Sequence, residues 1–149
     1  MTTNSGRELI KHLRKRHHSQ CIVCGDSNGQ GLHLDFSLCE DGSVEASFPC
    51  DLPYQGYDGI LHGGIISCLL DGAMTNCLFS QGITAATGEL VMRFHHPVVA
   101  GVPAKVIARV SKARPPLHLL ESELTQDDRL MVRATAKFME TRWQNVSCQ

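Results

Sequence analysis

A single acidic residue in an otherwise apolar stretch is the first feature of this sequence that suggests chemistry. Between Gly59 and Gly88, Asp71 is the only residue with a full charge at neutral pH. Ser67 and Thr75 lie four residues before and after it, so a helix would place all three side chains on one narrow stripe. Partial burial raises the pKa of a carboxyl group and makes it a better base. The stripe therefore faces a cleft or a second subunit, unless Asp71 is a structural residue that hydrogen-bonds a neighbouring loop.

The tripeptide His62-Gly63-Gly64 begins the same stretch. Two glycines at a helix N-terminus leave backbone N–H groups free, with no side chains to obstruct an approaching ligand. The helix dipole helps such N–H groups to bind an oxyanion or a phosphate, and at a reacting carbonyl they form an oxyanion hole. The alternative is that the glycines allow the helix start to pack closely against a strand.

The spacing between Gly63 and Asp71 limits how they can act together. Eight residues of helix span about 12 Å, because the helix rises about 1.5 Å per residue. One carbonyl carbon therefore cannot contact both residues of one helix. If both act on one substrate, they come from two chains whose helices lie side by side. Catalysis thus predicts at least a homodimer, with sites between the subunits.

Hydrophobic periodicity predicts the elements that hold these residues. Residues 63 to about 80 are apolar on nearly every face, which is typical of a helix enclosed by other elements. Alternating apolar residues on either side of a turn at 40–42 predict a β-hairpin over 32–48. Four further strands are expected, with short connections that favour antiparallel pairing, at 89–94, 104–110, 117–125 and 130–138. We therefore expect an α+β fold, with an antiparallel sheet of five to six strands wrapped around one long central helix.

Length and composition narrow the class of protein. The 149 residues fit one domain at 21–140, between an N-terminal helical arm at 1–20 and a C-terminal tail at 141–149. The net charge of −1 argues against a nucleic-acid partner, and the lack of a long apolar run argues against a membrane partner. Seven cysteines without a secretory signal indicate free thiols in the cytoplasm.

One Cys-x-x-Cys pair, Cys21 and Cys24, has His17, His18 and His33 nearby. These residue types can bind zinc or take part in thiol redox chemistry. A structural zinc site usually has four ligands, however, and only one such cysteine pair is present. We therefore expect no metal here, and interpret the segment as a turn with two small, partly buried thiols.

Residues 62–71 resemble the HGG…D signature of the PaaI-like group of hotdog-fold acyl-CoA thioesterases. Residues 55–61 resemble the loop that precedes this signature, and 87–98 resemble the strand that follows the helix. Residues 21–32 are similar to the CxxCG…N…GL segment of one PaaI-like subgroup. The similarity covers about residues 20–140, and it implies the hotdog fold.

The resemblance also implies roles for individual residues. Asp71 would be the general base that activates water, or the nucleophile. The Gly63 N–H would polarise the thioester carbonyl, Thr87 would help to place water, and His62 would shape the loop or the carbonyl pocket. The residues expected to contact substrate are Gly64, Gln55, Ser67 and Thr75.

Two positions depart from the pattern of the family. Several relatives have Asn a few residues before the HGG motif, where this chain has Gly56, and the neighbouring Gln55 would supply the amide instead. Close relatives often have Glu after the aspartate, where this chain has Gly72. Both departures concern rate and substrate more than fold.

The implied function is hydrolysis of an acyl thioester, in particular acyl-CoA, by a homodimer or a dimer of dimers. It needs no cofactor apart from the coenzyme A of the substrate. Two alternatives stay open. One is a module that binds acyl-CoA or an acyl carrier without turnover. The other is a 2-enoyl-CoA hydratase or dehydratase, in which His62 would be the catalytic histidine.

Overall fold

The computed structural model describes residues 3–142. Within this range the chain forms two α-helices, one 3-10 helix and six strands. In chain order these are α1 (Thr3–His17), β1 (Ser37–Leu38), β2 (Val44–Phe48), η1 (Leu52–Tyr54), α2 (Gly63–Phe79), β3 (Ala85–Phe94), β4 (Ala104–Arg114), β5 (Leu117–Gln126) and β6 (Arg129–Glu140). Part of the predicted tail, residues 143–149, lies outside the described residues.

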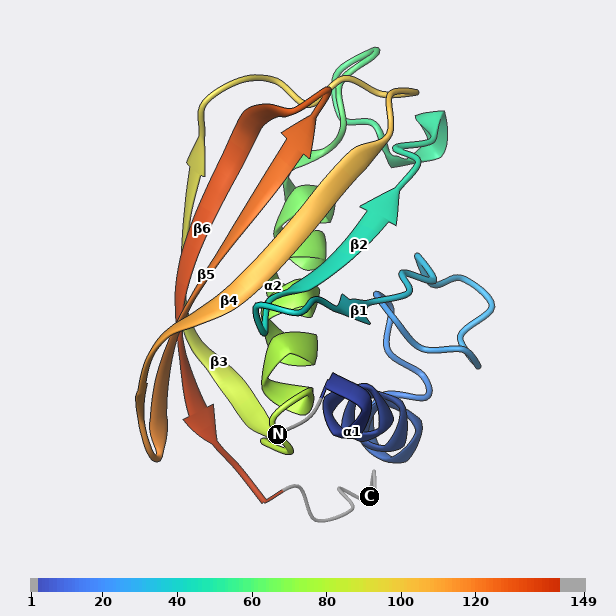
Figure 1. Cartoon of the computed structure of the whole chain (residues 1–149). Coiled ribbons are helices and arrows are strands. Elements are labelled where there is room, and N and C mark those ends of the chain that lie inside the picture. The colour runs from blue at the N-terminus through green and yellow to red at the C-terminus, as the bar shows by residue number, and fades with distance from the viewer. Residues whose placement is uncertain (1–2, 143–149) are drawn as a thin grey trace, which may run out of the picture.

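The six strands form one antiparallel sheet in the order β1-β2-β4-β5-β6-β3. Figure 1 shows this sheet curling around α2, which packs mainly against β4 and β5. The predicted hotdog architecture is therefore confirmed. Asp127 and Asp128 form the β5–β6 turn, and both adopt the left-handed backbone conformation that Asp tolerates in tight turns.

The central helix α2 begins at Gly63 and ends at Phe79, close to the predicted 63–80. Its apolar residues fill the concave face of the sheet, and those that are completely buried include Leu69, Leu70, Ala73, Met74 and Cys77. The chain then turns at Gly82, whose φ of +75° suits glycine best. Burial on nearly every face explains why the sequence of this helix has almost no polar side.

The predicted hairpin over 32–48 is wrong in its first half, because only Ser37 and Leu38 pair with β2. The N–H groups of Leu32 and Leu34 instead donate to the carbonyls of Ile22 and Val23. His33 between them has a φ of +52°, which interrupts an extended strand. The alternation did indicate a buried face, since Leu34 lies in the core. The backbone of this segment, however, hydrogen-bonds to the Cys-x-x-Cys segment rather than to β2.

Within residues 3–142, strand β3 lies at one edge of the sheet and pairs with β6 alone. It carries a bulge between Thr87 and Glu89. Two large apolar side chains of this strand, Val91 and Phe94, are about half exposed. An edge strand that is long and partly apolar is a surface on which another chain can pair.

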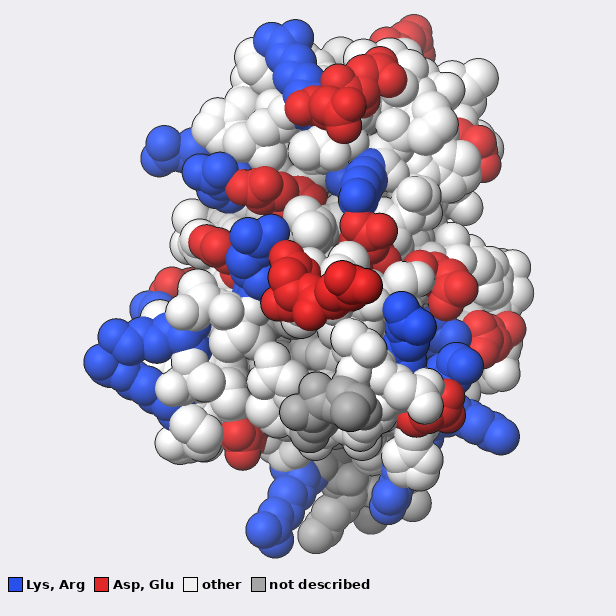
Figure 2. Space-filling model, viewed as in Figure 1, with Lys and Arg blue, Asp and Glu red and all other residues white. Residues whose placement is uncertain are grey.

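Helix α1 packs against α2 and β1 through its buried residue Ile10. It spans Thr3–His17, within the helical arm predicted at 1–20. Within residues 3–142, no helix is long and apolar enough to cross a membrane. Figure 2 shows acidic and basic side chains interspersed over the face viewed, in agreement with the net charge of −1.

Candidate active site

Asp71 and Thr87, two of the predicted site residues, are in direct contact. Asp71 lies in the middle of α2, and Thr87 lies beside the bulge of β3. The Thr87 hydroxyl donates a hydrogen bond of 2.6 Å to Asp71 Oδ1. Thr87 is exposed and Asp71 is half-buried, so the pair lies where α2 approaches the surface beside the edge strand. The second carboxylate oxygen of Asp71 has no hydrogen-bond partner among residues 3–142.

The pKa of Asp71 is raised above the usual value for an aspartic acid. Burial of the carboxyl group is the largest cause, because desolvation disfavours the charged form. The Cys21 thiolate also raises this pKa, whereas the Thr87 hydrogen bond and the nearby His18 lower it. The net effect makes Asp71 a stronger base than an exposed aspartate.

At the N-terminus of α2, His62 acts as the N-cap residue. Its Nδ1 accepts a hydrogen bond of 2.8 Å from the Gly64 N–H, and its carbonyl accepts one from the Ile66 N–H. The Gly64 N–H is thus already engaged. By contrast, no protein acceptor within residues 3–142 takes the Gly63 N–H. Gly63 therefore offers the free donor that an oxyanion hole needs.

An apolar pocket of about 330 Å³ adjoins this free N–H. Gly63 and Ile66 of α2 line one side of it, and Phe94 of β3 and Tyr57 of the preceding loop line another. A Cβ atom at position 63 would lie 3.7 Å from the Phe94 ring. The donor therefore faces an apolar, partly open environment, in which a hydrogen bond to a developing negative charge is stronger than in water.

Ser67 and Thr75 use their hydroxyl groups within α2. The Ser67 hydroxyl donates to the Gly63 carbonyl at 2.9 Å, and the Thr75 hydroxyl donates to the Asp71 carbonyl at 3.1 Å. Such bonds to the preceding turn satisfy a side chain inside a helix. Their expected contact with substrate stays a prediction, but it would have to use their lone pairs or break these bonds.

Gln55 likewise has a role inside the protein. Its Oε1 accepts a hydrogen bond of 3.0 Å from the Gly59 N–H and so holds the loop that leads to α2. A Cβ atom at Gly56 would lie 3.3 Å from the His62 ring, which is closer than ordinary packing. A residue with a side chain at position 56 would therefore require the His62 ring to shift by a few tenths of an ångström.

The second departure, Gly72, is explained by the Cys-x-x-Cys segment. Val23, between the two cysteines, packs on α2 so closely that a Cβ atom at position 72 would lie 2.6 Å from its Cγ1. This contact brings Cys21 into the neighbourhood of Asp71. Both features stand out in the sequence, but no sequence signal connects them, because they lie about 50 residues apart in the chain.

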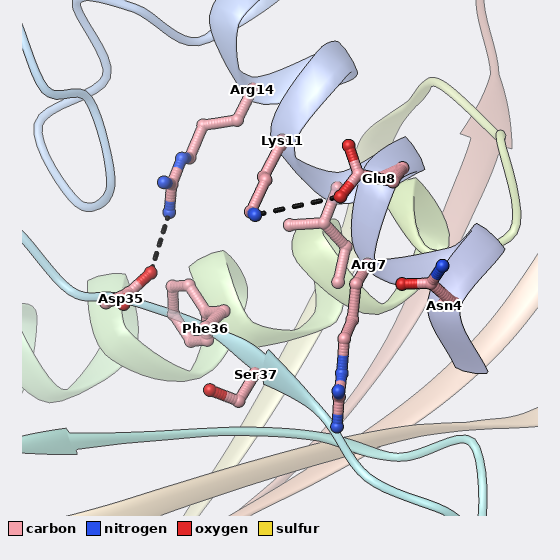
Figure 3. A pocket seen from close by; sticks show the side chains of 9 residues that line it. Asn4, Arg7, Glu8, Lys11, Arg14, Asp35, Phe36 and Ser37 are labelled. Atoms are coloured by element: carbon pink, nitrogen blue, oxygen red, sulfur yellow. Dashed lines mark hydrogen bonds and ion pairs between the residues drawn. The ribbon is translucent and has the colours of Figure 1, made fainter.

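A further pocket, of about 350 Å³, lies between α1 and residues 35–37 (Figure 3). Two of the basic side chains that line it are paired with acidic ones. Arg14 contacts Asp35 at 3.3 Å, and Lys11 contacts Glu8 at 3.7 Å. None of the predicted site residues lines this pocket.

Comparison of the sequence with models of known protein families identifies the family of this chain. Residues 58–132 match the model of the thioesterase superfamily, and this range contains both Gly63 and Asp71. The chain belongs to the thioesterase superfamily. No protein of curated function matches the chain.

Solved structures of thioesterase superfamily proteins share its fold. The PaaI protein of the Escherichia coli phenylacetic acid degradation operon has 17% identity and a TM-score of 0.79, over 95% of this chain and 97% of that one. A hypothetical thioesterase from Streptococcus pneumoniae, solved with coenzyme A, has 16% identity and a TM-score of 0.68, over 75% and 91%. A third protein of the superfamily has 23% identity and a TM-score of 0.76, over 80% of this chain but only 60% of that longer one.

The family match makes this chain a thioester hydrolase of the thioesterase superfamily, and the solved structures share its hotdog fold. Within it, Asp71 with Thr87 and the Gly63 N–H form two separate polar centres along α2. His62 and Gln55 support the second centre by fixing the backbone around it.

Proposed function

We propose that the protein hydrolyses acyl-CoA thioesters at sites shared by two subunits, with Asp71 from one and Gly63 from the other. The observation that carries this proposal is the presence on one helix of an activated carboxylate and a free N–H donor too far apart to serve one carbonyl. Thr87 fixes Oδ1 of Asp71 and leaves the other oxygen available. The two centres complement each other chemically, since one supplies a base and the other stabilises an oxyanion.

In the proposed reaction, Asp71 takes a proton from a water molecule as that water attacks the thioester carbon. The Gly63 N–H donates to the carbonyl oxygen, which becomes negatively charged in the tetrahedral intermediate. The intermediate then breaks its C–S bond, and the sulfur leaves with the proton held by Asp71. The products are a carboxylic acid and the free thiol of coenzyme A. Water is the only co-reactant, so the reaction uses no further cofactor.

A second route has the same residues in different roles. Asp71 would attack the thioester carbon itself and release the thiol, and water would then hydrolyse the resulting anhydride. Both routes depend on the free oxygen of Asp71 and on the Gly63 N–H. Label from solvent ¹⁸O that appears in the Asp71 carboxyl group after a single turnover would establish the anhydride route, because it enters there only when water attacks the Asp71 carbon of the anhydride.

The surface of β3 supports the assembly that this site requires. The strand has a free edge and two half-exposed apolar residues, Val91 and Phe94. A second subunit that packs here would cover Phe94, which lines the pocket beside Gly63, and would lie close to Thr87. We therefore propose a homodimer, or a dimer of dimers, whose interface includes β3.

Two further observations support the substrate class and the acidic residue. The Streptococcus pneumoniae relative was solved with coenzyme A. Two variants of that protein replace an aspartate and a threonine sixteen residues apart, which is the spacing between Asp71 and Thr87.

The described cysteines are all unpaired, which supports a reducing compartment such as the cytoplasm.

The cap geometry of His62 limits the role that the hydratase alternative would give this residue. Its Nδ1 accepts from the Gly64 N–H, so a neutral ring carries its proton on Nε2. While it caps the helix, His62 can donate a proton through Nε2 but cannot take one through Nδ1.

The decisive experiment mixes two inactive variants. Gly63→Pro removes the free N–H, and Asp71→Asn removes the base. In a mixed dimer with shared sites, one site holds both intact residues, so random mixing restores about a quarter of wild-type thiol release. If each site lies within one chain, mixing restores nothing and the two-subunit site is wrong. A wild type that releases no thiol from short, long or aromatic acyl-CoAs would contradict hydrolysis itself.

A further inference from the structure

Three side chains outside the proposed active site converge on one point. His18 follows α1, and Cys21 and Cys24 lie in the turn after it. One potential ligand atom from each of them lies within 4.8 Å of the other two. Cys24 Sγ is 3.8 Å from His18 Nδ1. In a tetrahedral zinc site, with bonds of about 2.3 Å to sulfur and about 2.0 Å to nitrogen, neighbouring ligand atoms lie about 3.5 to 3.8 Å apart.

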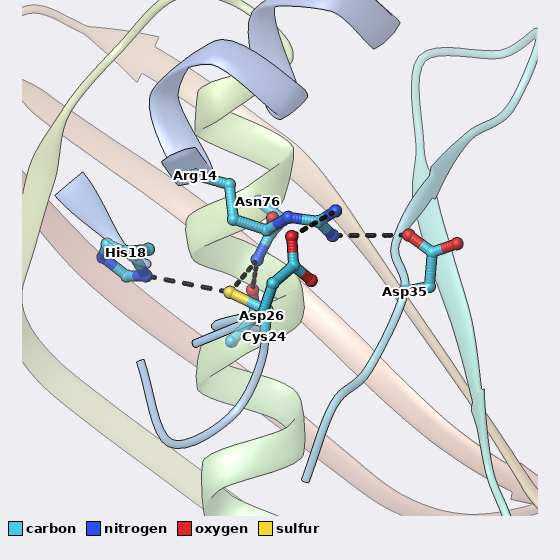
Figure 4. Close-up of polar contacts among 7 residues, drawn as sticks. Arg14, His18, Cys24, Asp26, Asp35 and Asn76 are labelled. Carbon is cyan, nitrogen blue, oxygen red and sulfur yellow. Dashed lines mark hydrogen bonds and ion pairs between the residues drawn. The ribbon is translucent and has the colours of Figure 1, made fainter. Parts of the chain in front are cut away.

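Hydrogen bonds already support both sulfur atoms as acceptors. The Val23 N–H donates to Cys21 Sγ at 3.4 Å. The buried amide nitrogen of Asn76 donates to Cys24 Sγ at 3.5 Å and to the Gly72 carbonyl at 2.9 Å (Figure 4). The Gly72 carbonyl can only accept a hydrogen bond, so the Asn76 atom beside it must be the amide nitrogen. The second proton of that nitrogen then points to Cys24 Sγ. Donors of this kind stabilise the thiolates that bind metals.

The backbone holds the three residues in this arrangement. The Cys21 N–H donates to the His18 carbonyl, and the Gly25 N–H donates to the Cys21 carbonyl. A Cβ atom at Gly25 would lie only 2.4 Å from the Cys21 nitrogen, so this tight turn requires glycine. The His18 ring packs edge-on against Phe79, with ring centroids 4.9 Å apart, which fixes its direction.

Charged residues brace the chain around this turn. Figure 4 shows Arg14 of α1 between Asp26 and Asp35, which lie on the two sides of the loop. Arg14 is 3.9 Å from Asp26 and 3.3 Å from Asp35. The cluster is therefore preorganised by contacts that do not depend on any bound ion.

We infer that His18, Cys21 and Cys24 bind one Zn²⁺ ion per chain, with a water molecule in the fourth position. Two thiolates and one imidazole are a ligand set that zinc prefers. The ion would fasten the end of α1 to the loop that packs on α2 at Gly72. This site lies within one subunit and supplies no group that contacts the substrate in the proposed hydrolysis, so it stands whether or not that proposal holds.

Metal analysis of the full-length chain tests the inference. The protein is reduced, stripped of metal, reconstituted with Zn²⁺ and passed through gel filtration. We expect about one zinc per chain, and Co²⁺ in its place should give thiolate charge-transfer and tetrahedral d–d absorption. Bound zinc should also protect Cys21 and Cys24 of the wild type from alkylation, mapped by mass spectrometry, until a chelator is added.

Matched variants distinguish a specific zinc site from nonspecific binding of zinc to thiols. His18→Gln, Cys21→Ser and Cys24→Ser should each lower the zinc content severalfold, whereas His17→Gln and Cys39→Ser should not. Circular dichroism monitors folding, and the wild-type alkylation pattern does not depend on any variant. Failure of the reconstituted wild type to retain zinc would overturn the inference. So would zinc content that falls equally in the control variants, or a Cys21–Cys24 disulfide that forms readily in the presence of zinc.

Discussion

The middle and the N-terminus of α2 differ in nearly every property except the helix that they share. The middle presents one half-buried carboxyl group, held by Thr87 and bordered by the Cys-x-x-Cys turn. The N-terminus presents a backbone N–H in an apolar, half-exposed pocket, with His62 as its cap. In the first region the chemistry depends on which side chain is present. In the second it depends on a side chain being absent.

Because of this difference, the two regions can be tested separately. A change at Asp71 alters a functional group with little effect on shape. A change at Gly63 can delete a backbone donor without touching any acidic residue. The separation of about 12 Å along the helix also keeps the direct effects of the two changes largely independent within one chain.

The largest effect is expected for Asp71→Asn. The amide still accepts the Thr87 hydrogen bond but cannot take a proton, so kcat for thiol release should fall by about 10²- to 10⁴-fold. Asp128→Asn, in the β5–β6 turn, is the matched control and should keep its activity. If kcat of Asp71→Asn stays within about twofold of the wild-type value, Asp71 has no part in the mechanism.

The same variant should change stability in a predictable direction. Because the pKa of Asp71 is raised in the folded state, the unfolded chain releases this proton more readily, and wild type loses stability as pH rises through that range. Asp71→Asn should therefore raise the melting temperature at neutral pH, and the gain should vanish below the pKa of an unfolded Asp. Thermal unfolding at several pH values measures both. A gain of equal size at every pH would contradict the raised pKa.

Gly63→Pro is expected to have the next largest effect. Proline suits the first position of a helix and lacks precisely the N–H that has no acceptor there. The extended backbone of His62, at φ −63° and ψ 133°, is compatible with a following proline. Loss of one oxyanion donor should lower kcat by about 10²- to 10³-fold with no loss of melting temperature.

Gly63→Ala is the control for the proline variant, since it keeps the N–H and places its Cβ in ordinary contact with Phe94. It should lose much less activity than Gly63→Pro. Equal losses in both variants would mean that bulk at position 63, rather than the missing donor, causes the defect.

A smaller effect is expected for Thr87→Val, which removes the hydroxyl but keeps the shape. The Thr87 hydrogen bond lowers the pKa of Asp71, so its loss should raise that pKa further. The acidic limb of the pH profile of kcat/KM should move to higher pH, and activity near neutrality should fall about tenfold. Thr87→Ser should restore the wild-type profile. An unshifted acidic limb in Thr87→Val would show that this hydrogen bond does not tune the base.

The smallest effect on catalysis is expected for Gly72→Ala. Its Cβ would collide with Val23, so overpacking should cost about 1 to 3 kcal/mol of unfolding free energy. Val23→Ala in the same chain should recover part of that loss, as measured by chemical denaturation of both single variants and the double variant. Additive losses would mean that the turn does not pack on α2 as described. The activity of Gly72→Ala should change by less than that of Thr87→Val.

Local sequence patterns predict the parts of this protein that depend on residues close together in the chain. The apolar run of α2, its capping start at His62, the lone charge of Asp71 and its eight-residue distance from Gly63 are all properties of one continuous segment. Helical periodicity converts such a segment directly into geometry. The four strands after the helix follow for the same reason, since alternation and tight turns are local patterns.

Contacts between segments that are distant in the chain could not be predicted from the sequence. In the folded chain, Asp71 contacts Thr87 on the edge strand, and His18 lies beside Cys21 and Cys24. The turn that holds these two cysteines packs against Gly72. The backbone on either side of His33 hydrogen-bonds to residues 22–23, although the alternation of apolar and polar residues there predicted a strand of the hairpin. Backbone donors of one segment pair with whichever acceptors the packed core brings near. Side-chain periodicity tells which face is buried, but not which segment lies against it.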